Sequence, residues 1–467
     1  MAVDVAKVML FGKQIGAVAW NEANNVAAFE YVPRFQREGL NIAPFMMPLR
    51  SRIYTFPELE RESFHGLPGM LADSLPDKFG NLLIDEWLTR QGRDPKSFTP
   101  IERLCYVGIR GMGALEFHPA IVPSGRSKSV EIDSLVELAQ QALDEKETLK
   151  VKVGIDSKTD EDAMSDILRV GTSAGGARAK AIIAWNEKTG EIRTGQVKAP
   201  NGFTYWIIKF DGLAGNRDKD LEDPKDFGMV EYAYYLMAKE AGIVMPECRL
   251  YEESNRHHFV TRRFDRSDDG EKIFMQSLCA LGHLDFNKAG AYSYEQAIDS
   301  AQRLEVPKFD LEQLFRRMIF NVFSRNQDDH TKNISFLMDR KGGWTLSPAY
   351  DMTFAYNPTG PWTSQHQMTI NGKRDNFEIT DFKAVAARFR LGSASKVSNI
   401  LVEIDDAVAS WPKFGVQAGI KESRITGIQN THRRLHNLHP AKPSNTIVAR
   451  TEKRRSRQQA LRPNRKS

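Results

Sequence analysis

One segment in the last third of the chain restricts the fold more than any other, because a helix pattern, a polar loop and a hairpin pattern follow one another directly. Apolar residues recur at helical spacing from Leu311 to Phe323, which predicts a helix with one buried face. The next residues read SRNQDDHTKNISFLMDRKGGWTLSPAYDM. We expect a polar loop at 326–333, strands at 334–339 and 344–349, and a Gly-Gly turn at 340–343.

This hairpin brings three polar side chains to one place. Two strands of equal length joined by a short turn return to the same end, so Asn333 should lie beside Asp351, with Asp328 on the preceding loop. Magnesium prefers oxygen ligands, so Asn333 and Asp351 suit a metal, and Asp328 is left to accept a proton from a hydroxyl. The D-x-x-x-x-N spacing followed by a later Asp is that of a protein-kinase catalytic loop. The alternative is a polar loop that only turns the chain.

A lysine inside an apolar strand pattern is the second candidate. Lys209 lies in FTYWIIKFDG, where a lone cation is costly unless it is paired. A kinase needs such a cation over the phosphates of its nucleotide. Glu231, on a helix that we predict at 229–241, is the expected partner. A strand-edge lysine that points to water is the alternative.

A loop of small residues, GTSAGGARAK at 171–180, precedes a predicted strand at 181–185. Small residues let backbone N–H groups approach phosphate oxygens closely. The loop matches neither G-x-G-x-x-G nor a Walker motif, so by itself it is weak support for a nucleotide site.

Composition excludes several classes of protein. No run of 18 apolar residues occurs, and the N-terminus MAVDVAKVMLFGKQ lacks the apolar core of a signal peptide, so we expect no membrane span. Three widely spaced cysteines argue against a disulfide framework and a zinc site, and they fit a reducing compartment. We therefore expect a cytoplasmic protein.

The net charge of +5 is concentrated at the C-terminus. Residues 441–467 hold nine Lys/Arg and one acid, so this tail carries +8 and the rest of the chain −3. We expect a disordered tail that touches nucleic acid or an acidic partner, with a solvated tail as the alternative.

The remaining pattern predicts an α+β protein. Short β-rich runs open the chain, helices are expected at 80–88 and 130–147, and the last third is expected to be helical apart from one hairpin.

Taken together, these motifs resemble the HipA family, the toxin kinases of bacterial HipBA-type toxin–antitoxin modules. The resemblance covers about residues 5–410 and is carried by NQDDHTKN followed by LSPAYD, by SAGGARAK, YWIIKF, LMAKEAGI and RRFDR, and by LPGMLADSLPDKFG. It implies a bilobal protein-kinase-like fold with a β-rich N-lobe and a mainly α-helical C-lobe. The expected parts are a first N-terminal subdomain (1–125), the rest of the N-lobe (126–272), the helical C-lobe (273–440) and the tail (441–467).

The resemblance also implies roles for particular residues. Asp328 would be the catalytic base, Asn333 and Asp351 would bind Mg²⁺, and Lys209 would contact the ATP phosphates, supported by its ion pair with Glu231. Further ATP contacts are expected from Gln276 and Leu278 near adenine, from Ser173, Gly175 and Gly176 in the Gly-rich loop, and from Lys332, for which shaping the loop is the alternative.

In this family a serine of the Gly-rich loop is autophosphorylated, and Ser173 takes that place, with Thr172 as the adjacent candidate. A phosphate adds roughly −2 charge, enough to reorder a loop that contacts ATP. Two residues depart from the family pattern: Asp329 stands where a small residue is expected, and Gln327 replaces a threonine.

The implied activity is that of a serine/threonine protein kinase that uses ATP and Mg²⁺, with a protein substrate such as an aminoacyl-tRNA synthetase. The implied partner is a HipB-like helix-turn-helix antitoxin, with operator DNA bound through it. Two other hypotheses remain open: a small-molecule or lipid kinase of related fold, and an ATP-binding transcriptional co-repressor.

Overall fold

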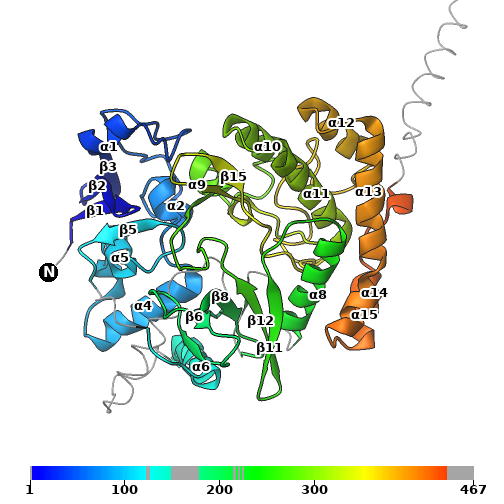
Figure 1. The fold of residues 1–467 in the computed structure, drawn as a ribbon, viewed down its shortest axis with the longest axis horizontal. Helices are drawn as coiled ribbons and strands as arrows, with labels where there is room; N and C mark the ends of the chain where they lie inside the picture. Colours follow the sequence, from blue (N-terminus) through cyan, green and yellow to red (C-terminus); the bar gives the residue numbers. More distant parts are fainter. Residues whose placement is uncertain are drawn as a thin grey trace, which may run out of the picture.

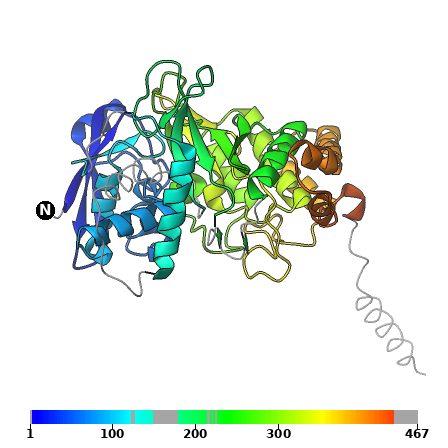
Figure 2. The same ribbon diagram turned by 90° about the horizontal axis from the view of Figure 1, so that it is seen from below.

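The fold is that of a computed structural model, which describes residues 3–121, 127–148, 178–213, 217–218, 221–222 and 226–438. The two ribbon views show the N-terminal strands at one end of the molecule and the C-terminal helices at the other (Figures 1 and 2). Within the described residues, the strands form two five-stranded sheets, one three-stranded sheet and one two-stranded pair, all antiparallel. The expected bilobal α+β fold is therefore present.

The first sheet belongs to the N-terminal module. Its strands run in the order β4-β3-β2-β1-β5, and every neighbouring pair is antiparallel. Burial alternates along β1, where Ala6, Val8 and Leu10 point inward, so one face of this sheet packs on the core. The strands are β1 (Val5–Leu10), β2 (Lys13–Asn21), β3 (Val26–Tyr31), β4 (Ile53–Tyr54) and β5 (Leu115–His118).

Helices surround this sheet and lead into the N-lobe. The helix expected at 80–88 is longer at both ends. At its start, the Asp77 carboxylate caps it by accepting the Gly80 N–H at 2.6 Å. The helix expected at 130–147 is also present. The helices are α1 (Pro33–Glu38), α2 (Arg61–Phe64), α3 (Gly69–Ala72), α4 (Lys78–Arg90), η1 (Pro95–Ser97), α5 (Pro100–Val107) and α6 (Ile132–Thr148).

The second sheet has the strand order β11-β12-β8-β6-β7 and is antiparallel throughout. Lys209 ends its central strand, directly opposite Lys180 in the ladder. Helix α8 (Phe227–Glu240) packs on β12. The strands are β6 (Lys180–Trp185), β7 (Ile192–Thr194), β8 (Thr204–Lys209), β11 (Cys248–Glu253) and β12 (Arg256–Arg262), and a separate short pair comprises β9 (Arg217–Asp218) and β10 (Leu221–Glu222).

The third sheet corrects one prediction. The expected hairpin is present as β14 (Ser335–Met338) and β15 (Trp344–Leu346), but both strands are shorter than predicted. A third strand, β13 (Phe274–Ser277), comes from the middle third of the chain and pairs with β14, so the hairpin is part of a three-stranded sheet. This pairing joins residues about sixty positions apart, which local periodicity does not report.

The helical lobe forms around α11 (Lys308–Ser324), the predicted amphipathic helix. The predicted apolar face is confirmed, because its central and C-terminal residues are fully buried: Leu314, Phe315, Met318, Ile319, Val322 and Phe323. The other helices of this lobe are α9 (Leu278–Gly282), α10 (Tyr294–Arg303), η2 (Thr331–Asn333), α12 (Ile379–Phe389), α13 (Ala394–Ala409), α14 (Trp411–Gln417), α15 (Glu422–Gln429) and η3 (Leu435–Asn437).

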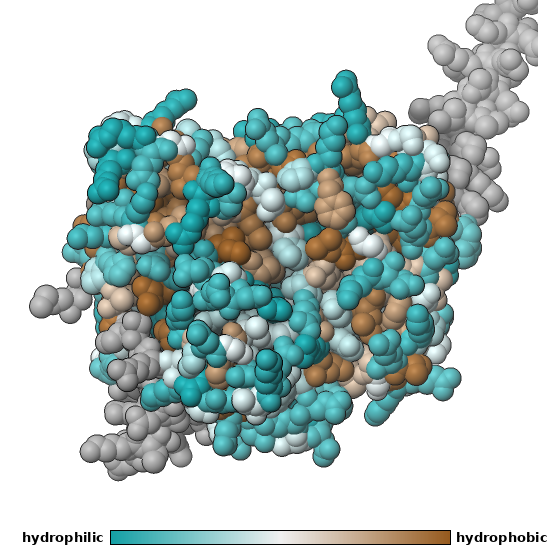
Figure 3. All heavy atoms as spheres, viewed as in Figure 1, coloured by the Kyte–Doolittle hydropathy of each residue, from teal (hydrophilic) through white to brown (hydrophobic). Residues whose placement is uncertain are grey.

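The surface agrees with a protein that keeps its apolar side chains inside. In the view of Figure 3, hydrophilic residues cover most of the face, and hydrophobic residues show between them in small groups. Within the described part of the chain, no helix combines the length and the apolar character that a bilayer crossing would need.

Candidate active site

The catalytic-loop candidate begins where α11 ends. Arg325 adopts a left-handed conformation (φ 60°) that stops the helix, and the Asn326 side chain donates to Asn321 at 2.9 Å, which fixes the start of the loop. Asp328 follows with about a fifth of its side chain exposed. Its Oδ1 accepts a hydrogen bond from Trp362 Nε1 at 2.5 Å and lies 3.9 Å from His330 Nε2.

Asn333 is tied directly to the Asp328 backbone. Its Nδ2 donates to the Asp328 carbonyl at 2.9 Å, and its own N–H bonds to the His330 carbonyl at 2.9 Å, so the loop closes on itself. Because the amide nitrogen is used in this way, Oδ1 is the Asn333 atom that would serve a metal.

The hairpin places Asp351 near the catalytic-loop candidate, because the preceding residue, Tyr350, contacts that loop. Ser347 pairs with Ser335 at 2.9 Å, and the Tyr350 hydroxyl donates to the Lys332 carbonyl at 2.7 Å and lies 2.6 Å from Ser335 Oγ. Asp351 comes next in the chain and has a left-handed backbone (φ 52°). Aspartate adopts this conformation more readily than most residues other than glycine, and it marks a sharp change in chain direction at this point.

Asp351 is in ionic contact with the predicted lysine. Lys209 Nζ lies 2.5 Å from Asp351 Oδ1 and 2.6 Å from Glu231 Oε1, so one ammonium joins two carboxylates from α8 and the hairpin end. Burial lowers the pKa of Lys209, but the charges of Asp351 and Glu231 raise it by more, and the net pKa is raised. Burial raises the pKa of Asp351, while Lys209 and Lys180 lower it by more, so the net pKa is lowered.

The donor set fits a magnesium ion that also binds substrate phosphate. Asp351 offers a carboxylate whose side chain is about a third exposed, and Asn333 offers an amide oxygen. Magnesium keeps several waters and takes one or two protein groups together with phosphates, so these two ligands are enough. Within the described residues, no cluster of three or more His, Cys, Asp or Glu forms a protein-only metal site.

Two acids of the N-terminal module that the sequence did not point to contact residues of the second and third sheets. Asp77, at the start of α4, pairs with Lys180 at 3.0 Å, and both side chains are 3% exposed. Asp73 accepts the Ser277 N–H at 2.6 Å and the Ser277 hydroxyl at 2.8 Å. A second lysine at the start of an apolar strand, as in KAIIAW, was the one signal that pointed to Lys180.

The remaining candidates have different surroundings. Gln276 opposes Phe336 in the ladder, and its Nε2 donates to the Ile42 carbonyl at 2.7 Å. The Leu278 N–H donates to the Ile334 carbonyl at 2.7 Å, and the Lys332 ammonium lies over the Phe286 ring, 4.8 Å from its centre. Ser173, Thr172, Gly175 and Gly176 lie outside the described residues.

Asp329, which departs from the family pattern, has a buried carboxylate. Its carboxylate accepts hydrogen bonds from the Tyr294 hydroxyl at 2.9 Å and from the Gln367 N–H at 2.8 Å, and it lies 2.8 Å from His366 Nδ1. Both the Asp329 and His366 side chains are almost fully buried. Asp329 therefore anchors the loop through contacts with Tyr294, His366 and Gln367.

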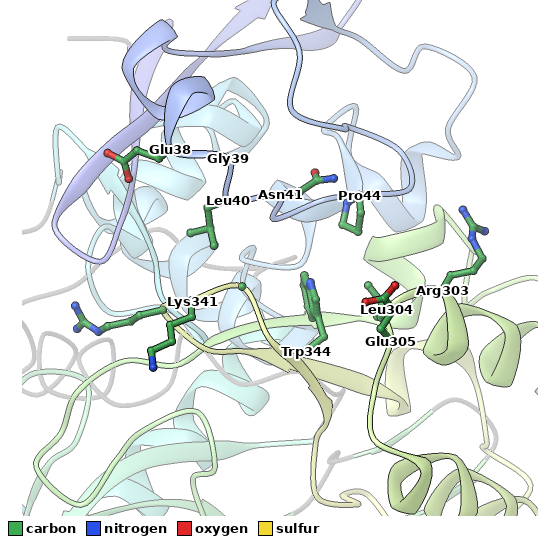
Figure 4. A pocket seen from close by; sticks show the side chains of 12 residues that line it. Glu38, Gly39, Leu40, Asn41, Pro44, Arg303, Leu304, Glu305, Lys341 and Trp344 are labelled. Carbon is green, nitrogen blue, oxygen red and sulfur yellow. The ribbon is translucent and has the colours of Figure 1, made fainter.

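A separate cavity of about 410 Å³ lies away from this site, and Figure 4 shows its residues. It is bounded on one side by residues 38–44 of the N-terminal module and on the opposite side by the turn of the β14–β15 hairpin, Trp344 and Leu304. None of its lining residues is among the four convergent site residues Asp328, Asn333, Asp351 and Lys209.

Two family profiles match the chain, and together they cover both lobes. The HipA N-terminal domain matches residues 6–118, and the HipA-like C-terminal domain matches residues 172–411, which is more than half of the chain. The fold and the site define a bilobal α+β protein with a kinase-like fold. The chain belongs to the HipA family.

Curated relatives match over a shorter stretch. The chain is 31% identical over 134 residues to a Haemophilus influenzae protein named “Putative kinase”, which is 26% of this chain and 39% of that protein. It is 25% identical over 134 residues to “Putative kinase Y4dM” of Sinorhizobium fredii, which is 26% of this chain and 32% of that protein. The chain thus matches well under half of the length of either relative.

A solved structure matches nearly the whole chain. It is a chain of the Shewanella oneidensis MR-1 toxin–antitoxin complex of HipA, HipB and operator DNA, with a TM-score of 0.61 and 17% identity. The match covers 91% of this chain and 95% of that chain. At this identity the likeness establishes the fold.

Proposed function

We propose that this protein is a serine/threonine protein kinase that transfers the γ-phosphate of ATP to a protein hydroxyl, as the toxin of a type II toxin–antitoxin system. The observation that carries the proposal is a pair of contacts at the candidate site. Lys209 joins Glu231 to Asp351, and Asn333 is bonded to the Asp328 backbone. This is the set of groups that phosphoryl transfer by a kinase requires.

Each group has one role in the proposed reaction. The Lys209 ammonium moves from Asp351 to the ATP phosphates while Glu231 keeps it oriented. The attacking hydroxyl oxygen forms a bond to the γ-phosphorus as the bond from that phosphorus to the β–γ bridging oxygen breaks, which leaves ADP. The hydroxyl proton passes to the Asp328 carboxylate.

Asn333 and Asp351 would hold magnesium, which when bound neutralises phosphate charge. We further propose that Gln276 and Leu278 border the adenine and that Lys332 and the Gly-rich loop, with Ser173, Gly175 and Gly176, contact phosphates. Ser173, or Thr172 beside it, is the proposed autophosphorylation site. The division into parts at 1–125, 126–272, 273–440 and 441–467 belongs to the same proposal.

The proposed partners follow the family. A HipB-like antitoxin with operator DNA is supported by the composition of the Shewanella complex, whose fold this chain shares. An aminoacyl-tRNA synthetase is the proposed class of protein substrate. A cytoplasmic location is supported by three buried cysteines that are all free thiols.

Labelled ATP tests the proposal. With [γ-³²P]ATP and Mg²⁺, the wild-type protein should label itself on the peptide that contains Ser173, and Ser173→Ala should remove that label. Asp328→Asn keeps the size of the side chain but removes the base, so the rate should fall by about 10²- to 10⁴-fold. Asp269→Asn, at an exposed position of a surface turn, is the matched control.

Two outcomes would contradict the proposal. ATP binding by the wild-type protein without any labelling of protein would support an ATP-binding co-repressor. A wild-type protein that labels lipid or a small molecule, and no protein, would support the related non-protein kinase. Thermal melting of every variant shows whether a lost activity reflects a lost fold.

A further inference from the structure

A loop outside the predicted motif faces the catalytic candidate. Residues 362–367, here called the strap, follow the hairpin by more than ten positions, and they begin with Trp362. The indole Nε1 of Trp362 donates to Asp328 Oδ1 at 2.5 Å. A hydrogen bond to an ionised carboxylate is among the stronger contacts in proteins, so it limits rotation of the acid.

Two glutamine side chains hold the strap in place, one from the loop that carries Asp328 and one from the strap itself. Gln327 Nε2 donates to the Thr363 carbonyl at 3.2 Å, and Gln367 Nε2 donates to the Trp362 carbonyl at 2.5 Å. Gln327 is fully buried and Gln367 is 3% exposed. The indole is therefore presented to Asp328 by a fixed backbone.

The strap also holds the neighbouring aspartate. The Gln367 N–H and His366 Nδ1 both contact the Asp329 carboxylate at 2.8 Å, inside the protein. On its other side, His366 Nε2 lies 3.0 Å from Arg433 Nη1, and Arg433 donates to the Val322 carbonyl of α11 at 3.2 Å. Two consecutive acids of one loop are thus held by one six-residue segment that points them in different directions.

We propose that Trp362 is a positioning residue for phosphoryl transfer, and that its indole N–H orients the Asp328 carboxylate toward the attacking hydroxyl. This inference rests on the proposed kinase function. In this proposal the indole N–H holds Oδ1 in place, and the hydroxyl proton passes to Oδ2. A carboxylate held by a donor also stays ionised at lower pH than one without it. His330 faces the same oxygen at 3.9 Å, and it is unchanged in the variants below.

Two substitutions separate the donor from the bulk of the ring. Trp362→Phe keeps an aromatic ring without the N–H, whereas Trp362→His keeps a ring nitrogen at the position of the indole nitrogen and loses the second ring. Trp20→Phe, in β2 of the N-terminal module, is the matched control. The assay follows ADP release and self-labelling with MgATP between pH 5 and 9.

The expected result is a fall in kcat of about tenfold to hundredfold for Trp362→Phe, as for loss of one hydrogen bond to a charged group. KM for ATP should stay the same, and the acidic limb of the kcat profile should move to higher pH. Trp362→His should recover part of kcat and return the limb toward its wild-type position. Trp20→Phe should match the wild type.

Several outcomes would overturn the inference. Wild-type kcat and an unmoved acidic limb in Trp362→Phe would mean that the indole does not position Asp328. An increase in kcat would mean that Trp362 blocks the acid. Equal losses in Phe and His variants would mean that the ring only packs. No turnover by the wild-type protein would instead contradict the proposed function, and binding of MgATP by calorimetry would confirm that such a protein is folded.

Discussion

At the scale of single residues, the charge on Lys209 links the two halves of the site. Its ammonium bridges Glu231 on α8 and Asp351 beyond the hairpin, at 2.6 and 2.5 Å. Asp351 is thus held ionised by a cation that nucleotide phosphates would take over. In the proposed reaction, the nucleotide phosphates would replace the Asp351 carboxylate as a partner of Lys209.

This exchange predicts how Asp351→Asn will behave. The variant loses the carboxylate that would hold Mg²⁺, so Mg²⁺ should no longer strengthen ATP binding, and turnover should fall by at least 10²-fold. Metal-free ATP should bind as well as in the wild type or better, because one negative charge has left the site. Calorimetry with MgCl₂ and with EDTA measures both affinities.

Asp269→Asn serves as the control for this experiment too, since Asp269 is exposed on a surface turn. If Mg²⁺ strengthens ATP binding equally in Asp351→Asn and in the wild type, Asp351 is not a metal ligand.

At the scale of elements, the Asp77 carboxylate makes two contacts where the N-terminal module meets the N-lobe. The Asp77 Oδ1 atom caps α4 through the Gly80 N–H, and its Oδ2 atom pairs with Lys180 at the start of β6. Both partners of the pair are 3% exposed, so neither charge has much water around it. A helix start and a strand start are therefore coupled by one side chain.

Asp77→Ala should destabilise the protein by about 3–5 kcal/mol, because it removes the carboxylate that pairs with the buried Lys180 ammonium and also removes the cap. Asp77→Asn keeps a cap acceptor and should lose the charge contribution alone. Urea unfolding of both variants and of Lys180→Met gives the free energies.

The double variant Asp77→Ala, Lys180→Met is the decisive comparison. If the pair is coupled, it should be clearly less destabilised than the sum of the two single variants. Simple additivity would show that the 3.0 Å contact contributes nothing.

At the scale of the whole molecule, buried histidines join segments that are far apart in sequence. His283 Nε2, at the end of α9, accepts the Gly69 N–H of the N-terminal module at 3.0 Å, and His258 Nδ1 in β12 accepts the Asp211 N–H at 3.0 Å. Burial lowers the pKa of each to about 4 and that of His432 to about 3. The folded protein therefore favours the neutral form of these imidazole rings.

Stability should therefore fall as pH falls. Between pH 6.5 and pH 4 the unfolded chain binds protons that the folded protein does not, so each such histidine removes up to about 1.4 kcal/mol per pH unit. The contribution is fully present above pH 6.5. Urea unfolding at pH 7.5, 6.0 and 5.0 measures the slope.

His258→Asn retains an acceptor near the position of Nδ1 and removes the proton-binding group, so its unfolding free energy should depend less on pH than that of the wild type. His436→Asn, at an exposed position, should leave the dependence unchanged. Identical slopes for His258→Asn and the wild type would contradict the assignment.

The sequence by itself determined the elements whose signal is local. The helix Lys308–Ser324 and the strand that carries Lys209 follow from periodic burial, and the Asp328–Asn333 spacing already placed two polar groups on one loop. These features depend on neighbours a few residues away, so one stretch of letters contains them.

Tertiary packing decided the rest. The pairing of β13 with β14, the Asp77–Lys180 contact and the hydrogen bond from Trp362 to Asp328 each join positions with no periodic relation. Such contacts are selected by how whole surfaces fit and by which loops can close, and many partners in the chain are chemically equivalent before folding. That is why Asp328, the proposed base, could be singled out from sequence, whereas the Trp362 indole that contacts it could not.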